Sequence, residues 1–264
     1  MVVTALDKFD FAFKRVNHFL TLYDLLNNSN QRRSRTTWKD QFRQILKWPQ
    51  KEDIICIHGK DRNSLLLLKG SLGIERERFA HEFTSELLRS SIVASISALD
   101  KYFHDIIVQN SIKILSLPES DIPKEFSSLS IPIVSVKKAI DKVRKDNSAR
   151  PGYTIKQKLQ EVLHRDYTFQ NANSVIKASK MLGITDFWGK VAEKMPGTPS
   201  KGDVIDKLKE IATRRNQIVH ESDIIRQIKA QKINQRKITQ SQAVEYSDWV
   251  KDFISAVDAV VNEN

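Results

Sequence analysis

Cysteine, glycine and proline are scarce in this 264-residue chain, and each scarcity excludes a class of structure. A single cysteine, Cys56, excludes an internal disulfide and any zinc site built from several cysteines. Eight glycines and seven prolines leave long stretches without a helix breaker, which favours helices. The longest apolar runs, such as residues 65–68, are far too short to cross a membrane, so we expect no membrane contact.

The first ten residues also lack the basic and then apolar pattern of a secretory signal. We therefore expect a cytoplasmic protein that is complete from Met1. What the chain does have is positive charge: 43 lysines and arginines against 32 acids give a net charge of +11 and a pI near 9.6. Such a surplus suits a polyanionic partner such as a nucleic acid. A basic but otherwise ordinary surface would give the same value, so charge alone does not decide the function.

Hydrophobic periodicity predicts a mostly helical chain. Apolar residues at three- and four-residue spacing predict helices over 5–27, 37–48, 74–110, 134–145, 154–165, 173–182, 185–194, 203–220 and 239–261. Asp203 is the expected N-cap of the helix that it begins, residues 117–132 are expected to be an irregular connection and residues 195–202 a loop. Residues 53–68 hold two apolar runs around a polar turn, which fits a small β-hairpin or a buried helix.

These patterns predict an all-α fold, namely a helical bundle with a long central helix. We assign the bundle to residues 74–264. Residues 1–73 are then an N-terminal helical extension of unknown role, which includes the small β-hairpin if residues 53–68 form strands.

The usual catalytic motifs are absent. The chain has no phosphate-binding P-loop, no dinucleotide-binding glycine motif, no nucleophile elbow and no H-E-x-x-H pair. Its six histidines do not fall at metal-ligand spacing. A metal-dependent or nucleotide-hydrolysing enzyme is therefore disfavoured, and we expect neither a metal nor a cofactor.

One stretch carries a different chemistry: Arg215, Asn216 and His220, near the end of a predicted helix. An arginine offers a planar fork for phosphate oxygens, and a histidine exchanges a proton near neutral pH. On a helix, positions five apart point about 140° away from each other. The two side chains can act on one ligand if the helix ends or bends there, or if a second chain completes the site. Arg214 lies beside Arg215 and is expected to support it.

The spacing of an arginine five residues before a histidine is weak evidence, because so short a motif arises by chance. Arg76 and His81 also match it. That second match has no asparagine after the arginine, and the intervening Phe79 and Ala80 are typical of core packing. We therefore interpret it as coincidence.

The sequence around Arg215 resembles the HEPN superfamily, in its ribonuclease-like RiboL-PSP-HEPN branch. The hallmark of that family is an arginine, then a polar residue, three further residues and a histidine, which RRNQIVH at residues 214–220 matches. A second likeness lies in ALDKYFH at residues 98–104, which is similar to the opening helix of such domains. The resemblance covers about residues 75–262.

The resemblance implies a helical bundle that forms a homodimer, in which two copies of the motif face each other. Active members are metal-independent endoribonucleases that use the ribose 2′-hydroxyl as nucleophile and leave 2′,3′-cyclic phosphate and 5′-hydroxyl ends. Such proteins often act as toxins or in prokaryotic antiviral defence, with an antitoxin or other partner protein. The alternative is a non-catalytic helical module that binds nucleic acid or a protein partner.

Several residues outside the motif are candidates for supporting roles. Asp100 lies at the edge of the long apolar stripe, where it either orients Arg215 or His220 or forms a structural ion pair. The basic stretch 227–237 follows the motif and is our candidate for holding an RNA strand, through Lys229, Lys232 and Arg236. The loop that holds Arg32, Arg33 and Arg35 is more typical of a solvated surface.

Overall fold

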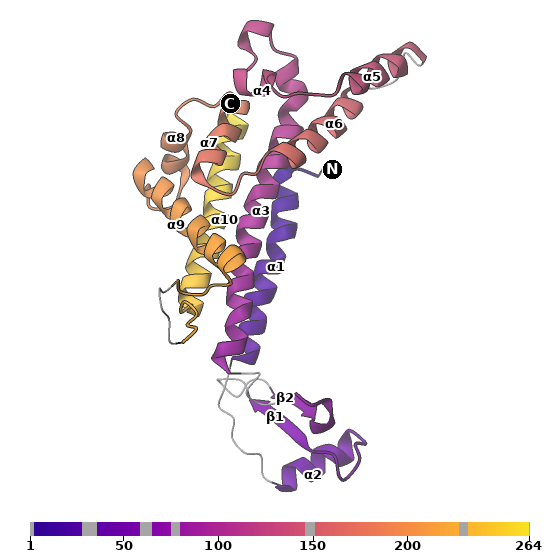
Figure 1. The fold of residues 1–264 in the computed structure, drawn as a ribbon, viewed down its shortest axis with the longest axis vertical. Helices are drawn as coiled ribbons and strands as arrows, with labels where there is room; N and C mark the ends of the chain where they lie inside the picture. Colours follow the sequence, from indigo (N-terminus) through magenta and orange to yellow (C-terminus); the bar gives the residue numbers. More distant parts are fainter. Residues whose placement is uncertain are drawn as a thin grey trace. The chain divides into compact units, whose positions relative to one another are not determined.

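The computed structural model describes residues 3–27, 36–58, 65–74, 80–145, 151–226 and 232–263 (Figure 1). In these ranges nearly all the regular secondary structure is helical, and the rest is a small antiparallel sheet, which confirms the predicted all-α fold and the hairpin. The chain divides into two compact units. The larger unit comprises Met1–Lys14, Ile92–Arg236 and Glu245–Asn264, and the smaller one Arg15–Ser91 and Lys237–Val244.

Parts of three long helices run alongside one another in the larger unit: α1 (Ala5–Leu26) as far as Lys14, α3 (His81–Leu115) from Ile92 onward and α10 (Gln240–Glu263) from Glu245 onward. Helix α1 is antiparallel to α3, because the Ala5 amide donates to Gln109 while Phe9 meets Tyr102 edge-on. Helix α10 is parallel to α3, because Ser95 pairs with Ser247 and the Tyr102 hydroxyl donates to Asp258 at 2.9 Å. Burial and the Asp258 carboxylate raise the pKa of Tyr102 far above its ordinary value, so the phenol stays a donor.

Shorter helices complete the larger unit. They are α4 (Lys124–Ser127), α5 (Ile133–Lys145), α6 (Pro151–Asp166), α7 (Ala172–Met181), α8 (Phe187–Lys194) and α9 (Lys201–Glu221). Helix α9 packs on α7 and α8 through a face that includes the buried Val204, Leu208 and Ile211. This apolar face recurs at helical spacing, so burying it fixes which side of α9 is turned to solvent.

The start of α9 corrects one prediction. Its N-cap is Ser200, whose hydroxyl accepts from the Asp203 amide at 3.2 Å. Asp203 is the third helical residue of the same capping box, and its carboxylate accepts from the Ser200 amide. The helix therefore begins at Lys201, two residues before the predicted start, because the box satisfies amides at both positions.

The long central helix also extends beyond its predicted end at Asn110, as far as Leu115. No glycine or proline lies between the two, and the Ser111 hydroxyl bonds back to the carbonyl of Val108. Part of the connection predicted as irregular is ordered as well, with a 3-10 turn at Glu119–Asp121 followed by α4. A breaker such as Pro118 ends a helix but does not prevent a new one from starting after it.

The smaller unit holds α2 (Thr36–Ile45) and two antiparallel strands, β1 (Ile54–His58) and β2 (Leu65–Lys69), in the register Ile54 to Lys69. Ile55 and Ile57 of β1 are buried in an apolar cluster that Leu26, Leu66 and Leu68 complete. The antiparallel pairing, which runs from Ile54 and Lys69 to His58 and Leu65, confirms the strand interpretation of residues 53–68. The boundary between 1–73 and 74–264 stays a prediction.

In the described ranges, no helix is both long enough and apolar enough to cross a membrane.

Candidate active site

Helix α9 carries the motif on its last two turns. The helix is continuous from Lys201 through Glu221, so Arg215, Asn216 and His220 all have helical backbone. The Arg215 side chain is half-buried, whereas Asn216 and His220 are exposed. Because α9 is helical without interruption from position 215 to position 220, Arg215 and His220 diverge by about 140° around the helix axis. Within one chain, the structure does not bring the arginine and the histidine to a common point.

The polar contacts of the motif leave several groups able to bind a ligand. One Arg215 nitrogen, Nη1, donates to the side-chain oxygen of Asn216 at 3.0 Å. The Arg215 Nε atom is buried without a hydrogen-bond partner among the described residues. The amide nitrogen of Asn216 and the ring of His220 point to solvent and can donate to phosphate oxygens. Asn216 therefore helps to orient the arginine and remains able to donate itself.

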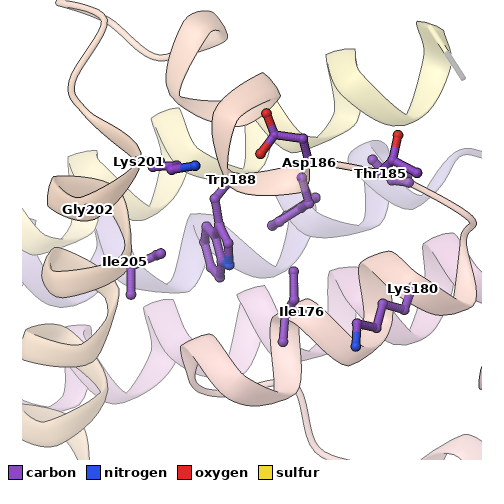
Figure 2. Close-up of a pocket in the computed structure, with 10 residues that line it drawn as sticks. Ile176, Lys180, Thr185, Asp186, Trp188, Lys201, Gly202 and Ile205 are labelled. Atoms are coloured by element: carbon purple, nitrogen blue, oxygen red, sulfur yellow. The ribbon is translucent and has the colours of Figure 1, made fainter.

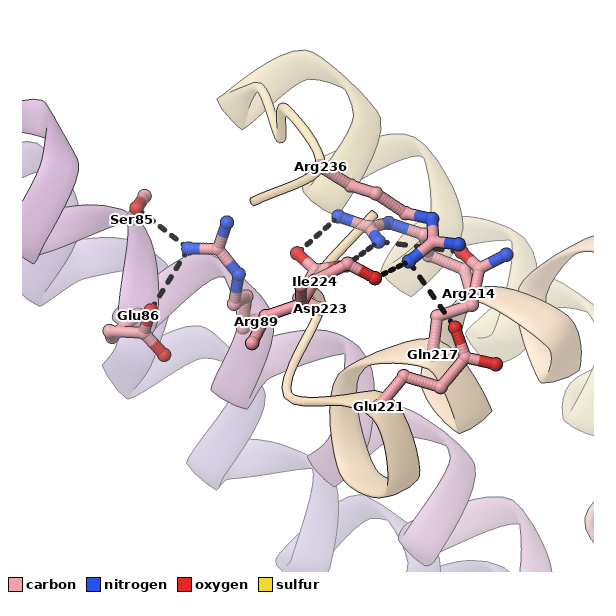
Figure 3. Close-up of polar contacts among 9 residues, drawn as sticks. All are labelled: Ser85, Glu86, Arg89, Arg214, Gln217, Glu221, Asp223, Ile224 and Arg236. Carbon is pink, nitrogen blue, oxygen red and sulfur yellow. Dashed lines mark hydrogen bonds and ion pairs between the residues drawn. The ribbon is translucent and has the colours of Figure 1, made fainter. Parts of the chain in front are cut away.

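A strained turn follows the motif directly. Ser222 and Asp223 both have left-handed backbone, with φ of 50° and 56°, and the carbonyl of Gln217 accepts the Asp223 amide at 2.9 Å. The Asp223 carboxylate is fully buried and forms a bidentate ion pair with Arg214, one branch of which measures 2.8 Å (Figure 3). Left-handed backbone without glycine costs roughly 1–2 kcal/mol per residue. The ion pair offsets that cost and fixes the chain immediately after His220.

We expect Asp223→Ala to lower the free energy of unfolding by about 3–5 kcal/mol, because it leaves the Arg214 charge buried without its partner. Urea denaturation measures the change. Asp206→Ala is the matched control, since Asp206 pairs with Lys209 on the exposed side of α9 and should cost no more than about 0.5 kcal/mol. A loss below about 1 kcal/mol for Asp223→Ala would contradict a structural role for the pair.

The basic stretch after the motif contains both a residue with structural contacts and an exposed residue that can bind RNA. Arg236 donates to the carbonyl of Ile224 at 2.6 Å and pairs with Glu221 at 3.3 Å, so this arginine holds the turn (Figure 3). Lys232 is exposed and can meet a phosphate. Lys229 lies outside the described residues, as do Arg32, Arg33 and Arg35.

Asp100 has partners of its own in the larger unit. Its carboxylate accepts from the Gln170 side chain at 3.0 Å and from the Phe169 amide, and it lies 3.6 Å from His104. Burial raises the pKa of Asp100, but these hydrogen bonds outweigh it and hold the pKa below the ordinary value. Neither Arg215 nor His220 is among its partners. Within one chain, Asp100 therefore anchors the segment before α7.

Two stacked histidines lie beside Asp100. His104 is buried, its Nδ1 has no hydrogen-bond partner among the described residues, and its ring stacks on that of His164 with centroids 4.3 Å apart. Partial burial and the neighbouring His104 and Lys101 lower the pKa of His164. In the ranges that the structure describes, His, Cys, Asp and Glu nowhere gather in groups of three that could hold a metal ion.

The competing motif match has a structural explanation at its histidine. His81 begins α3 in the smaller unit, and its Nδ1 atom forms a 3.0 Å hydrogen bond with the hydroxyl of the buried Tyr23. The two rings also meet edge-on. Arg76, the other half of this match, lies outside the described residues.

The motif lies on a regular, partly exposed helix, and comparison with known families decides which family the chain belongs to. A family model described as RiboL-PSP-HEPN matches residues 60–263, well over half of the chain. The chain belongs to the RiboL-PSP-HEPN family. Comparison with curated proteins and with solved structures gives no match. The family assignment and the helical fold are consistent with each other and compatible with a nuclease-type function.

Sequence reasoning on this HEPN protein missed the part played by Asp223 and Glu221. In the sequence Asp223 is typical of a turn residue, and the structure adds that its buried carboxylate pairs with the charge of Arg214. Glu221, next to His220, pairs with both Arg226 at 3.2 Å and Arg236. The available signal was two acids, Glu221 and Asp223, placed between arginines on both sides, a pattern that ion pairs across a turn produce.

Proposed function

We propose that this RiboL-PSP-HEPN protein is a metal-independent endoribonuclease whose site is completed by a second copy of the chain. The observation that carries the proposal is the regularity of α9 through Glu221. It separates Arg215 from His220 around one helix, so a single phosphate meets both groups when a second α9 faces the first. A two-fold axis beside α9 supplies such a facing copy.

The proposed reaction is an intramolecular transesterification. The ribose 2′-oxygen attacks the adjacent phosphorus and gives up its proton, while the bond from phosphorus to the 5′-oxygen breaks and that oxygen gains a proton. The products are a 2′,3′-cyclic phosphate and a 5′-hydroxyl. Two copies of His220, one from each chain, can divide the work of base and acid, because histidine side chains serve in both roles in proton transfer. Arg215 opposes the charge that develops on the phosphate oxygens.

The charge of the chain supports an RNA substrate. The net charge of +11 attracts polyphosphates, and Lys232 is exposed on the segment that follows the motif. A role as a toxin or antiviral effector, restrained by an antitoxin or other partner, is part of this proposal. The second candidate is a non-catalytic binding module, which the same exposed motif and charge would also serve.

Incubation of labelled RNA with the purified protein in EDTA separates the two candidates. Cleavage that proceeds in EDTA is the expected result and supports the enzyme. Binding without cleavage, under conditions where the protein is folded and dimeric, would contradict the proposed activity and favour the binding module.

The dimer is tested separately by mass. We expect light scattering after size exclusion to give twice the chain mass of 30.4 kDa at micromolar concentration. Specific activity per chain should fall on dilution once the dimer dissociates, because each protomer alone has half of the site. A protein that is strictly monomeric and still cleaves RNA would contradict the composite site.

A further inference from the structure

A pocket of about 650 Å³ lies in the larger unit at the end of α9 opposite the motif (Figure 2). Helices α7 and α8 and the first turns of α9 line it. The floor is apolar, and lysines stand on either side of it. The residues that matter for its chemistry are Ile176, Lys180, Asp186, Trp188, Lys201 and Ile205.

Trp188 gives the pocket a fixed aromatic surface. Its indole is half-buried, packs edge-on against Phe187 and stacks on Phe253 with centroids 6.1 Å apart. Figure 2 shows the indole between Ile205 and Ile176, beside the hollow. A ring held in this way can stack on a planar ligand at little cost in side-chain entropy, as nucleobase-binding aromatics do.

Lysines flank the pocket. Lys180 lies on one side, with Glu125 at 3.7 Å, and Lys201 lies on the other and forms no ion pair with a described residue. Lys201 is the first residue of α9, where the helix dipole disfavours a cation. Because Lys201 has no ion-pair partner among the described residues, its charge is available to an anionic ligand. Residues 172–203 hold five lysines against three acids, so the surroundings attract rather than repel a phosphate.

Asp186 limits where that phosphate can lie. Its backbone is left-handed, with φ of 43°, and its carboxylate lies against Gly189, where an added Cβ would come within 2.4 Å of the Asp186 oxygen. The acid is therefore held against the first turn of α8 on one side of the pocket. A phosphate is repelled from that side and directed toward Lys201.

The pocket and the motif lie along one side of the same helix. Gly202 at the pocket and His220 in the motif are eighteen residues apart, which is five helical turns, so they share an azimuth. Lys209 and Thr213 lie within about 20° of that line and are exposed. At 1.5 Å per residue, Lys201 and Arg215 are about 21 Å apart along α9. A strand of several nucleotides covers this span while staying on a surface open to solvent.

We infer that this pocket is a subsite for one base of the RNA strand, with the indole of Trp188 as the stacking surface and Lys201 as the partner of the adjacent phosphate. The inference rests on the proposed ribonuclease function, because it places the remote part of the same substrate. A protein side chain would also fit an apolar pocket, but Lys201, which has no ion-pair partner among the described residues, and the alignment of Gly202 with His220 favour the nucleic acid.

Binding of a fluorescent twelve-nucleotide single-stranded RNA tests the subsite. Every variant also carries His220→Ala, so that the RNA stays intact during titration. We expect Trp188→Leu to weaken binding at least about fivefold and Trp188→Phe to retain most of the affinity, since a base stacks on any aromatic face. Thermal unfolding of each variant shows whether the loss of the indole disturbs the fold.

Lys201→Glu provides a second variant that should not disturb folding, because an acid is favoured in the first turn of a helix. It should weaken binding about fivefold or more and reduce the slope of log affinity against log salt by about 0.7 or more, the share of one phosphate contact on a single strand. Lys251→Glu is the matched control. It makes the same change of charge at an exposed position on α10. Both the affinity and the salt slope should stay near those of the protein that carries His220→Ala alone.

Unchanged RNA affinity in Lys201→Glu and in a folded Trp188→Leu would overturn the subsite, even if the wild-type protein cleaves RNA. Unchanged affinity together with loss of the dimer would instead assign the pocket to a protein interface and would also overturn it. Failure of the ribonuclease proposal looks different, because the wild-type protein then binds RNA in the pocket without cutting it. If the protein that carries His220→Ala alone binds no RNA at all, both the subsite and the proposed ribonuclease function are overturned.

Discussion

His220→Ala and Arg215→Ala should each lower the rate of RNA cleavage by about a hundredfold or more. Removing a proton-transfer group or a charge-stabilising donor typically costs two or more orders of magnitude. Initial rates on labelled RNA, measured in EDTA, give the effect. His220 is exposed and makes no polar contact with a described residue, so its loss should change the free energy of unfolding by less than about 0.5 kcal/mol.

Two further variants make this test specific. Arg215→Lys should remain well below the wild-type rate, because a lysine keeps the charge but loses the planar fork. His81→Ala is the matched control for the histidine, since it removes the other histidine that fits the motif spacing. It loses the hydrogen bond to Tyr23, which costs about 1 kcal/mol of stability, and should leave the cleavage rate nearly unchanged. If His81→Ala abolishes cleavage while His220→Ala remains active, the catalytic site lies on α3 and not on α9.

A single deoxyribose on the 5′ side of the scissile phosphate should abolish cleavage there, because it removes the proposed nucleophile. The same substitution at a neighbouring nucleotide is the control and should leave the rate within about twofold, since it removes at most a hydrogen bond to the substrate. Mass spectrometry of the products should show a 3′ end lighter by one water than a linear phosphate. EDTA should not change the rate. Efficient cutting of DNA, or loss of activity in EDTA, would mean that the reaction is a different one.

The helices were predictable where apolar residues recur at helical spacing without interruption. The stripe from Phe79 to Ile106 predicted the central helix, and the two apolar runs around a polar turn in residues 53–68 fitted the hairpin that the structure confirms. The misplaced ends have local causes. Ser200 caps α9 earlier than Asp203 would, and the serines of α3 close hydrogen bonds back to the main chain without ending the helix. Such choices depend on which side chain reaches an amide or a carbonyl, and periodicity does not record them.

The candidate site was predictable in composition and not in geometry. Arg215, Asn216 and His220 are named by their order in the chain, together with the family that this order resembles. Arg214 and Arg215 look alike in the sequence, yet Arg214 is buried against Asp223 while Arg215 keeps an unpaired Nε. Their positions differ by about 100° around the helix, so the packing of α9 decides which arginine is used internally. Asp100 is likewise a candidate for the motif by sequence, whereas in the structure its carboxylate accepts hydrogen bonds from Phe169 and Gln170.

The sequence by itself determined the helical class of this RiboL-PSP-HEPN protein, its positive charge and the identity of its motif, because periodicity, composition and residue order are local properties of a chain. The tertiary structure decided that α9 stays regular past His220, that the Arg214–Asp223 ion pair fixes the turn behind it, and that a pocket with Trp188 lies along the same side of the helix. These features depend on which face of α9 is buried against α7 and α8. Burial is a property of the packed core, where residues distant in the sequence compete for the same space.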